Sequence, residues 1–395
     1  MARTRPGPLS DRKSIRMKIT RIESIPINVP LQPELTTKTA GGEHVVSPYV
    51  IVKMHTDAGL VGLGEATLSP RWSGETSPSC VAAIEGLIAP PLIGTDPTEI
   101  TRLRQQMERV LRHNPFTKAA VEMAAWDLAG KALNVPLYQL LGGRVRDTIP
   151  VKLVVGAFDV PQAVDLARRF LDLGARCLKV KVGLDADQDV ARVAAVRQEA
   201  GPEIPIGIDA NQGWDLTTAV RTLARLEDYD ILFAEQPIAA RDCQALAELR
   251  RSTRIPIMAD ESVFTLSDAW ELGRQRAADV LSVYPGKHGG ISATLEIADC
   301  ALAGNMLCSM GSNLELGIGA AAMLHLGAAV PVIASERFPG DFIGPLYHTA
   351  DMLTEPLPLG FDVARPPTGP GLGVELDEDQ LERYRDSSPV ARPLG

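Results

Sequence analysis

The spacing of apolar residues along this chain changes near residue 145, and the change divides the sequence into two regions. In the first, residues 18–30 and 48–56 alternate or run apolar with many β-branched side chains, which predicts two strands. Residues 80–141 then show helical spacing, with an Ala-rich stretch at 119–132, and Gly142-Gly143 follows as a helix end. We therefore expect residues 17–145 to form an α+β domain.

Two polar stretches interrupt this first region. Residues 31–46 join the two predicted strands and contain His44, and residues 69–79 follow the second strand and contain Trp72. Long loops in compact domains are often lids or binding loops. We therefore interpret His44 and Trp72 as candidate substrate-binding residues, with simple surface packing as the alternative for Trp72.

From residue 150 onward, short apolar strands alternate with helical stretches. Strands that alternate with helices form parallel sheets with right-handed crossovers. Eight such units make a closed (β/α) barrel the simplest architecture over residues 146–355, and no Gly-x-Gly-x-x-Gly turn supports an open dinucleotide-binding sheet. The tail, 356–395, is rich in Pro and Gly and then acidic, and we expect it to pack on the first domain. The eight strand candidates are residues 151–155, 177–182, 204–208, 231–234, 255–259, 280–283, 306–308 and 330–334.

Composition narrows the classes of function. The chain has 395 residues, a net charge of −9 and no basic stripe, which argues against nucleic acid as the main partner. Its five cysteines are widely spaced without a CxxC pair, which favours a reduced, cytoplasmic setting. The longest apolar stretch, about residues 316–334, contains His325 and Pro331 and predicts a buried helix and strand, so we expect no membrane partner. Residues 1–16 contain several basic side chains but lack the apolar core of a signal peptide. We expect them to be a disordered leader.

Four short motifs close successive predicted strands of the barrel: Lys179-Val-Lys181, Asp209-Ala-Asn211, Glu235-Gln-Pro237 and Asp260-Glu-Ser262. The gaps between Lys181, Asp209, Glu235 and Asp260 are 28, 26 and 25 residues, about the length of one strand-plus-helix unit. Catalytic residues of such barrels lie at strand C-termini. The spacing therefore predicts that two lysines face three carboxylates at one end of the barrel.

This arrangement indicates a base beside a divalent-metal site. Side chains two apart on a strand share a face, so Lys179 and Lys181 point the same way, and neighbouring positive charge should lower the pKa of a lysine towards that of a general base. Three carboxylates form a hard oxygen site suited to Mg²⁺. The alternatives are surface lysines and acids that merely cap the following helices. The regular succession of all five residues favours the catalytic interpretation.

In these motifs the chain resembles the enolase superfamily, in its mandelate racemase/muconate lactonizing (muconate cycloisomerase) branch, from about residue 18 onward. The resemblance implies an α+β capping domain, completed by the C-terminal tail, over a modified TIM barrel. It implies Mg²⁺ or Mn²⁺ on Asp209, Glu235 and Asp260, Lys181 as the base, and a homo-oligomer. It is carried by the four motifs above and by residues 121–143 with the ending Leu140–Asp147, Gly289-Gly290-Ile291, Gly344-Pro-Leu346 and Pro370-Gly-Leu-Gly373.

One departure from the family pattern is informative. The family usually has a second lysine at the end of the sixth strand, opposite Lys181, and Tyr284 occupies that position here. A tyrosine, with a reference pKa near 10, is a poor base. This favours a one-sided reaction, with Tyr284 either a hydrogen-bonding or proton-donating catalytic residue or a packing residue.

Further candidate substrate-binding residues follow from the same resemblance. Asn211 belongs to the second motif, Lys287 matches another family lysine, and Glu315 follows the seventh strand, where it either contacts substrate or caps the next helix. Glu336 and Asp341 lie near the predicted eighth strand.

The sequence thus predicts proton abstraction next to the carboxylate of a small acid, giving a metal-stabilised enolate, by a cycloisomerase or lyase. The alternatives are a racemase or epimerase of N-acyl amino acids or dipeptides, and a sugar-acid dehydratase. A non-catalytic barrel that binds a ligand is an alternative of a different class. A sugar-phosphate enzyme would need a phosphate site at residues 311–319, where no Lys or Arg lies.

Overall fold

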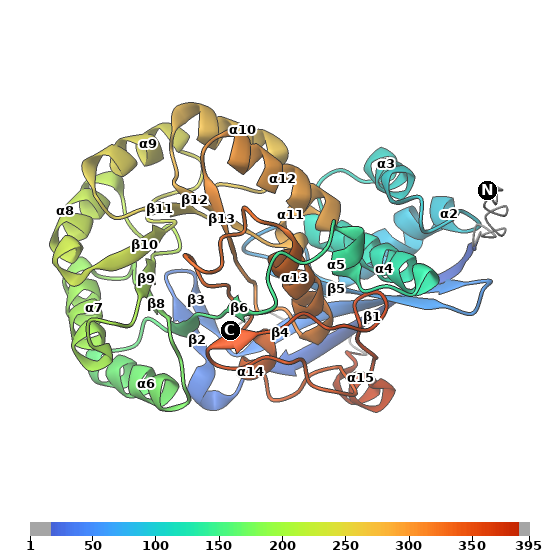
Figure 1. Ribbon diagram of the computed structural model, residues 1–395, viewed down its shortest axis with the longest axis horizontal. Coiled ribbons are helices and arrows are strands. Elements are labelled where there is room, and N and C mark those ends of the chain that lie inside the picture. Colours follow the sequence, from blue (N-terminus) through green and yellow to red (C-terminus); the bar gives the residue numbers. More distant parts are fainter. Residues whose placement is uncertain (1–16, 387–395) are drawn as a thin grey trace, which may run out of the picture.

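A computed structural model describes residues 17–386, and the predicted leader at 1–16 lies outside the described residues. A ring of helices surrounds a curved sheet, and a smaller sheet-and-helix unit lies beside it (Figure 1). This is the mixed α/β architecture expected from the sequence, a barrel with a capping unit. The boundary near residue 145 stays a prediction.

The smaller unit is built on a three-stranded antiparallel sheet in the order β1-β4-β5. The strands are β1 (Ile19–Pro30), β4 (Val46–Thr56) and β5 (Val61–Thr67). β1 and β4 confirm the two predicted strands. β5 was not predicted because its glycines weaken the apolar pattern that is typical of a strand. Its helices are α1 (Ser77–Ala83), α2 (Ala89–Leu92), α3 (Ile100–Val110), α4 (Pro115–Leu133) and α5 (Leu137–Leu140), with a π-helical turn at Ile84–Ile88 between α1 and α2.

Those glycines of β5 let the long helix α4 approach the sheet closely. A Cβ atom at Gly62 or Gly64 would collide with the backbone carbonyl oxygen of Ala124 or Ala120. Helix α4 is buried almost all round because the sheet covers one side and α3 and α11 cover others. Its Ala-rich composition follows from this close packing.

The predicted loop at 31–46 contains a small hairpin. It is formed by β2 (Thr37–Thr39) and β3 (Gly42–His44), which pair antiparallel, and a 3-10 turn, Pro33–Leu35, precedes it. The hairpin lies near the mouth of the barrel, as Figure 1 shows.

Seven parallel strands form the barrel sheet, and they lie side by side in chain order from β7 to β13. Each of the first seven predicted strands is confirmed, with ends shifted by at most two residues. The strands are β7 (Leu153–Val155), β8 (Leu178–Lys181), β9 (Ile206–Asp209), β10 (Ile231–Glu235), β11 (Ile257–Ala259), β12 (Val280–Val283) and β13 (Leu307–Met310). The helices that cover them are α6 (Val160–Asp172), α7 (Ala186–Ala200), α8 (Leu216–Leu226), α9 (Cys243–Ser252), α10 (Leu266–Gln275), α11 (Pro285–His288), α12 (Ile291–Ala303) and α13 (Gly317–Ala329), with a 3-10 turn, Glu227–Tyr229, after α8.

The eighth predicted strand, 330–334, is wrong. This segment makes one isolated parallel bridge, Ile333 with Cys308, and the bridge to the first strand's side comes later in the chain, from Gly340 to Val151. Pro331 has no backbone N–H to donate to a regular ladder. The ring is therefore closed by an irregular segment instead of a strand.

The described part of the tail returns to the smaller unit. Helix α14 (Gly344–Tyr347) precedes it, β14 (Val363–Ala364) pairs with β6 (Ile149–Pro150), and α15 (Glu378–Tyr384) contacts β1. Among residues 17–386, no helix is long and apolar enough to cross a membrane.

Candidate active site

The C-terminal ends of the barrel strands surround a cavity of about 230 Å³, which we call the catalytic cavity. Loops of the smaller unit supply its other wall, including the β2–β3 hairpin and the segment that carries Trp72. Of the thirteen candidate residues named from the sequence, nine line this cavity: His44, Trp72, Lys179, Lys181, Asp209, Asn211, Glu235, Asp260 and Asp341. The structure thus brings together the four motifs that end successive strands.

The two lysines of β8 both face this cavity, but they have different partners. Lys181 Nζ donates to Asp209 Oδ2 at 2.6 Å and to Asn211 Oδ1 at 2.8 Å. Lys179 Nζ lies 2.8 Å from Asp341 Oδ2 and 3.1 Å from Glu235 Oε2. Lys181 is therefore held at the second motif, while Lys179 lies among acids from other strands.

The acids reverse the expected pKa shift of Lys179. Burial alone would lower its pKa, but the carboxylates of Asp341, Glu235 and Asp209 outweigh burial and raise the pKa well above the ordinary value. The prediction that its neighbouring lysine would depress this pKa is wrong, because several carboxylates lie within 4 Å of its ammonium group. Lys179 is therefore a fixed positive charge.

The three predicted metal ligands end the adjacent strands β9, β10 and β11 or follow them directly. Asp209, Glu235 and Asp260 are all buried, and all line the catalytic cavity. In the described part of the chain, no group of three His, Cys, Asp or Glu side chains is arranged to hold a metal ion as it stands. The three carboxylates are instead paired with lysines. Carboxylate oxygens are ligands that suit Mg²⁺, but in the described structure these oxygens bind ammonium groups.

A buried glutamine braces two of the motifs against each other. The side-chain oxygen of Gln236 accepts hydrogen bonds from the backbone N–H groups of Asp260 and Ser262, both at 3.0 Å. Its amide nitrogen donates to Ser262 Oγ at 2.8 Å. Gln236 thereby fixes the turn after β11 relative to the end of β10, which positions Asp260 beside Glu235.

Tyr284 and Lys287 do not line the catalytic cavity. Tyr284 is fully buried against the rings of Trp72, Phe116 and His288, and its hydroxyl has no hydrogen-bond partner among the described residues. Burial, with Asp260 and Glu315 adding to it, raises the pKa of Tyr284 well above its usual value. The structure favours the packing interpretation of this residue.

Lys287 has a place that differs from the substrate contact expected for it. Its side chain is fully buried, and Nζ donates to Asp260 Oδ1 at 2.6 Å, to the Asp260 carbonyl oxygen at 2.9 Å and to the Ser282 carbonyl oxygen at 2.7 Å. These bonds use all three ammonium protons. Lys287 therefore supports Asp260 and does not itself line the cavity.

Glu315 is buried behind the residues that line the cavity. Its Oε2 accepts from Ser312 Oγ at 2.8 Å and from the Asn313 N–H at 3.0 Å, and burial raises its pKa to about 7. The helix-capping alternative is wrong for this residue. Glu65 of β5 fills that role, because it accepts from the N–H groups of Leu316 and Gly319 at the start of α13.

The two residues from the smaller unit lie at the cavity wall as expected. Trp72 is half-buried and packs against Phe264 and Tyr284, with ring centroids 6.3 and 6.2 Å apart. His44 Nε2 lies 2.7 Å from Ser47 Oγ, and burial lowers its pKa.

Some residues that line the catalytic cavity were not predicted from the sequence, and one predicted candidate near the eighth strand does not line it. Glu261 and Arg71 line the cavity, and so does Asp341, which was a minor candidate. Glu336 instead lies in an exposed ion pair with Arg146. Glu261 could have been predicted from its place in the motif Asp260-Glu-Ser262. The only sequence signal for Arg71 was its position next to Trp72.

Comparison with known proteins places these features in a family. The sequence model described as "Mandelate racemase / muconate lactonizing enzyme, N-terminal domain" matches residues 21–142, and "Enolase C-terminal domain-like" matches residues 162–380. A chloromuconate cycloisomerase of Cupriavidus pinatubonensis is 35% identical over 92% of this chain and 97% of its own length. An N-succinyl-L-Arg/Lys racemase of Bacillus cereus is 33% identical over 95% of this chain and 100% of its own length. The crystal structure of 2-chloromuconate cycloisomerase from Rhodococcus opacus superposes with a TM-score of 0.89 at 33% identity, covering 94% of this chain and 100% of that one.

Proposed function

The chain belongs to the mandelate racemase/muconate lactonizing enzyme family of the enolase superfamily, and from this premise we propose that it removes a proton from the carbon next to the carboxylate of a small acid, with Lys181 as the base. Because proteins of this family are isomerases and lyases, we reject the alternative of a non-catalytic barrel. One observation carries the proposal. Lys181 is the lysine whose ammonium group faces the catalytic cavity while bonded only to the second motif, so a substrate carbon can approach it there.

The other charged residues have separate tasks in this reaction. Lys179, held by Asp341 and Glu235, is the fixed positive charge beside the negative charge that develops on the substrate carboxylate. Asn211 accepts from Lys181 and keeps its ammonium group at the cavity. To act as a base, Lys181 has to lose a proton and break its ion pair with Asp209.

We further propose that Asp209, Glu235 and Asp260 hold Mg²⁺, with Mn²⁺ as a substitute. A divalent cation there supplies positive charge to the substrate carboxylate oxygens. Cation binding has to compete with the ion pairs that Lys179 and Lys181 make with these acids. With a cation on these acids, Asp209 would no longer pair with Lys181, and the added positive charge would favour loss of the ammonium proton, which Lys181 needs before it can act as a base.

The reaction is proposed to be one-sided, as in a cycloisomerase or lyase. The position where the family usually has a second lysine carries Tyr284, which is fully buried and absent from the cavity wall. No second base therefore faces Lys181 in that position. A sugar-acid dehydratase would use the same single base, and the choice among these substrates stays open. The cytoplasmic location and a homo-oligomer also stay predictions.

The test is solvent-deuterium exchange with Mg²⁺ present, using a panel of muconates, acid sugars and N-acyl amino acids. We expect the wild-type protein to exchange the proton next to the carboxylate of at least one acid without inverting that centre. Lys181→Met should slow exchange by about 100-fold or more, because a positioned base contributes about 10²–10⁴ in rate. Lys53→Met, on the far sheet, is the control. Equal rates in wild type and Lys181→Met would refute the base assignment, and inversion of the centre would refute the one-sided reaction.

A racemase of N-acyl amino acids is the second candidate. The observation that favours it is a larger cavity beside the catalytic one, which gives room for a substrate longer than a compact diacid. Inversion in the exchange experiment would select this candidate.

A further inference from the structure

A line of hydrogen bonds runs from the wall of the catalytic cavity into the interior of the protein, and we call it the His44 chain. It links His44 of the β2–β3 hairpin to Ser47 of β4 and to His348, which follows α14. His44 Nε2 lies 2.7 Å from Ser47 Oγ, and Ser47 Oγ lies 2.8 Å from His348 Nε2. The two inner members are buried, whereas His44 lines the cavity. The outer end of the chain therefore lies at the proposed substrate site.

The inner end of the chain fixes the proton of His348. Its Nδ1 lies 2.8 Å from the Gly344 carbonyl oxygen, which can only accept, so Nδ1 carries the proton. Burial lowers the pKa of His348 to about 4, so the ring is neutral near pH 7 and Nε2 is an acceptor. Tyr49 also lies beside this nitrogen, at 3.1 Å, but its hydroxyl donates to the Leu314 carbonyl oxygen at 2.6 Å. The proton that His348 Nε2 accepts therefore comes from Ser47.

The direction of this bond decides which nitrogen of His44 carries a proton. The Ser47 hydroxyl has a single proton to donate, and it goes to His348. Ser47 Oγ can then only accept from His44, so Nε2 is the protonated nitrogen of His44. In a neutral imidazole the other nitrogen, Nδ1, is an acceptor. Burial lowers the pKa of His44, which favours this neutral form.

The acceptor nitrogen of His44 is open to a ligand. Within residues 17–386, the His44 ring makes no hydrogen bond other than the one to Ser47. Nδ1 is not one of the fully enclosed polar atoms that lack a partner, so it keeps accessible surface. Because His44 lines the catalytic cavity, a ligand bound there can reach this nitrogen. An acceptor without a partner in such a wall is suited to a donor group of the ligand.

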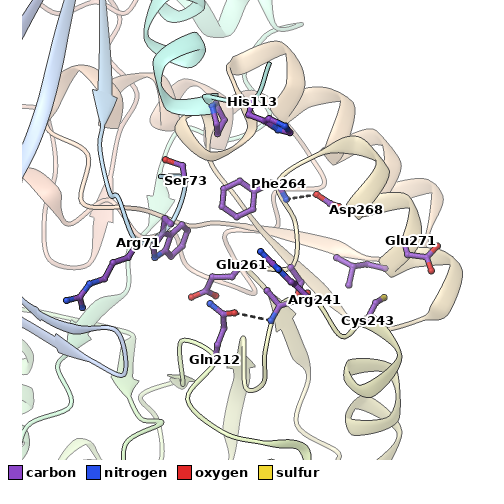
Figure 2. A pocket seen from close by; sticks show the side chains of 15 residues that line it. Arg71, Ser73, His113, Gln212, Arg241, Cys243, Glu261, Phe264, Asp268 and Glu271 are labelled. Atoms are coloured by element: carbon purple, nitrogen blue, oxygen red, sulfur yellow. Dashed lines mark hydrogen bonds between the residues drawn. The ribbon is translucent and has the colours of Figure 1, made fainter. Parts of the chain in front are cut away.

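The neighbouring polar group on the hairpin wall is of the opposite kind. Gly42 and His44 lie two residues apart on β3 and therefore share a face of the hairpin. The guanidinium group of Arg71 packs against Gly42, and Arg71 lines the catalytic cavity. Figure 2 shows the Arg71 side chain extending away from Phe264 and Glu261, which line the larger neighbouring cavity. Since arginine only donates hydrogen bonds, the wall presents donors at Arg71 and an acceptor at His44.

We propose that His44 is a specificity-determining residue whose Nδ1 accepts a hydrogen bond from a donor group on the substrate, and that Ser47 and His348 are positioning residues that hold this tautomer. The inference rests on the proposed function, because it assumes that the substrate carboxylate lies beside Lys181 in the same cavity. It deepens that function by giving the hairpin a preference for acids that carry a hydrogen-bond donor. An acid without a donor leaves Nδ1 of His44 without a partner.

The first experiment measures the tautomer directly. Long-range ¹H–¹⁵N NMR of the full chain distinguishes protonated from unprotonated ring nitrogens, and the signals of His44 are those that disappear in His44→Phe. We expect Nε2 to be protonated and Nδ1 to be unprotonated in the wild type near pH 7. In His348→Phe, Ser47 loses its acceptor and can turn its proton to His44, so the fraction with a protonated Nδ1 should rise. Ser47→Ala should raise this fraction too, because it removes the acceptor of the Nε2 proton.

Tyr49→Phe is the matched control for the tautomer. Tyr49 contacts His348 but donates its proton outside the His44 chain, so its replacement should leave the His44 signals in the wild-type pattern. A protonated Nδ1 in the wild type would overturn the proposal. The wild-type tautomer in both His348→Phe and Ser47→Ala would also overturn it, because Ser47 and His348 would then not position His44.

The second experiment tests recognition of the donor. The probes are glycolate, 3-hydroxypropionate and 4-hydroxybutyrate, each compared with its methyl ether, which keeps the oxygen acceptor and lacks the donor. NMR titration of the full chain with Mg²⁺ should show that at least one hydroxy acid binds about fivefold more tightly than its ether. A net hydrogen bond contributes about 1 kcal/mol, and about 1.4 kcal/mol is tenfold in affinity. His44→Phe should lower this ratio below about twofold, whereas Tyr49→Phe should preserve it.

A ratio near one at every chain length, no binding of any probe, or a ratio that survives His44→Phe would overturn the proposal. Deuterium exchange of the acid panel, measured on the same proteins, keeps this proposal separate from the proposed function. Exchange by the wild type without a preference for the hydroxy acids would support the chemistry and contradict the role of His44. The preference and the expected tautomer without exchange of any acid would support the role of His44 and contradict the proposed chemistry.

Discussion

The sequence position of Tyr284 indicates a catalytic role, whereas its surroundings in the structure indicate a packing role. The sequence prediction assigns Tyr284 to the position where the family usually has a base, yet its hydroxyl is buried without a hydrogen-bond partner in the described structure. A buried polar group left unpaired costs about 1–3 kcal/mol. Its ring packs against Trp72, so the residue supports the cavity wall through its aromatic face.

Tyr284→Phe should therefore leave the free energy of unfolding unchanged or raise it by about 1 kcal/mol, with kcat within about threefold of wild type. Urea denaturation and deuterium exchange measure the two quantities. Tyr347→Phe is the matched control, because that hydroxyl accepts from Val154 N–H and donates to the Val154 carbonyl oxygen, both at 3.0 Å. The control should lose about 1–3 kcal/mol. A loss of kcat above about tenfold in Tyr284→Phe would instead show that the phenol takes part in the reaction.

The candidate catalytic and metal-binding residues could be predicted because each one ends or directly follows an apolar strand at barrel spacing. Their partners could not, because they come from elsewhere in the chain. Asp341, which holds Lys179, is 162 residues away from it, and no local pattern connects the two. The same distance explains why the direction of the Lys179 pKa shift was wrong.

The β2–β3 hairpin is the element that connects the smaller unit to the mouth of the barrel. Gly42, in β3, has a φ of +119°, and a Cβ atom there would collide with the guanidinium group of Arg71. Arg71 lines the catalytic cavity, so a side chain added at Gly42 would move a residue of the cavity wall.

Gly42→Ala should raise KM several-fold by displacing Arg71, and it should also cost about 1 kcal/mol of stability because alanine is strained at positive φ. Gly59→Ala is the control, since Gly59 has a φ of +77° with open space around it. It should show a similar fall in Tm with KM unchanged. Steady-state kinetics and thermal denaturation of both variants check the prediction, and equal KM values in the two would contradict it.

Elements with a repeated apolar pattern were predictable, and elements defined by their partners were not. Seven barrel strands follow from short β-branched runs between helices. Strand β5 was not predicted because Gly62 and Gly64 weaken its strand pattern. These two glycines allow α4 to pack closely on the sheet. The segment at 330–334 has the composition of a strand, but Pro331 and its position at the closure of the ring prevent regular pairing.

At the scale of the whole molecule, single side chains join the two units and the tail. Glu65 of β5 accepts from the start of α13 in the barrel. His325 of α13 accepts from Tyr138 N–H through Nδ1, at 3.2 Å, and donates from Nε2 to the Leu372 carbonyl oxygen, at 3.1 Å. Both bonds of His325 together require the neutral imidazole.

The stability of the protein should therefore fall in mild acid. Burial lowers the pKa of His325 to about 4, against about 6.5 in the unfolded chain. The unfolded chain binds the proton more readily, so the contribution of His325 is complete above pH 6.5 and is lost as pH falls towards 4, by up to about 3 kcal/mol. Urea denaturation from pH 7 to 4 measures the loss.

His325→Gln is the matched variant, because glutamine gains no proton in this range. It should be less stable than wild type at pH 7 and lose stability less steeply between pH 6.5 and 4. Parallel pH profiles for the two proteins would show that His325 does not cause the acid sensitivity.

The return of the tail to the smaller unit has a consequence for synthesis on the ribosome. Asp127 of α4 accepts hydrogen bonds from the N–H groups of Leu63 and Leu372, and Asp386 N–H donates to the Pro26 carbonyl oxygen. Some hydrogen-bond partners of the smaller unit thus leave the exit tunnel only after the whole barrel. The barrel strands, each beside its predecessor in the sequence, can pair in the order in which they emerge. The smaller unit is therefore translated before the barrel, but its structure is completed after the barrel.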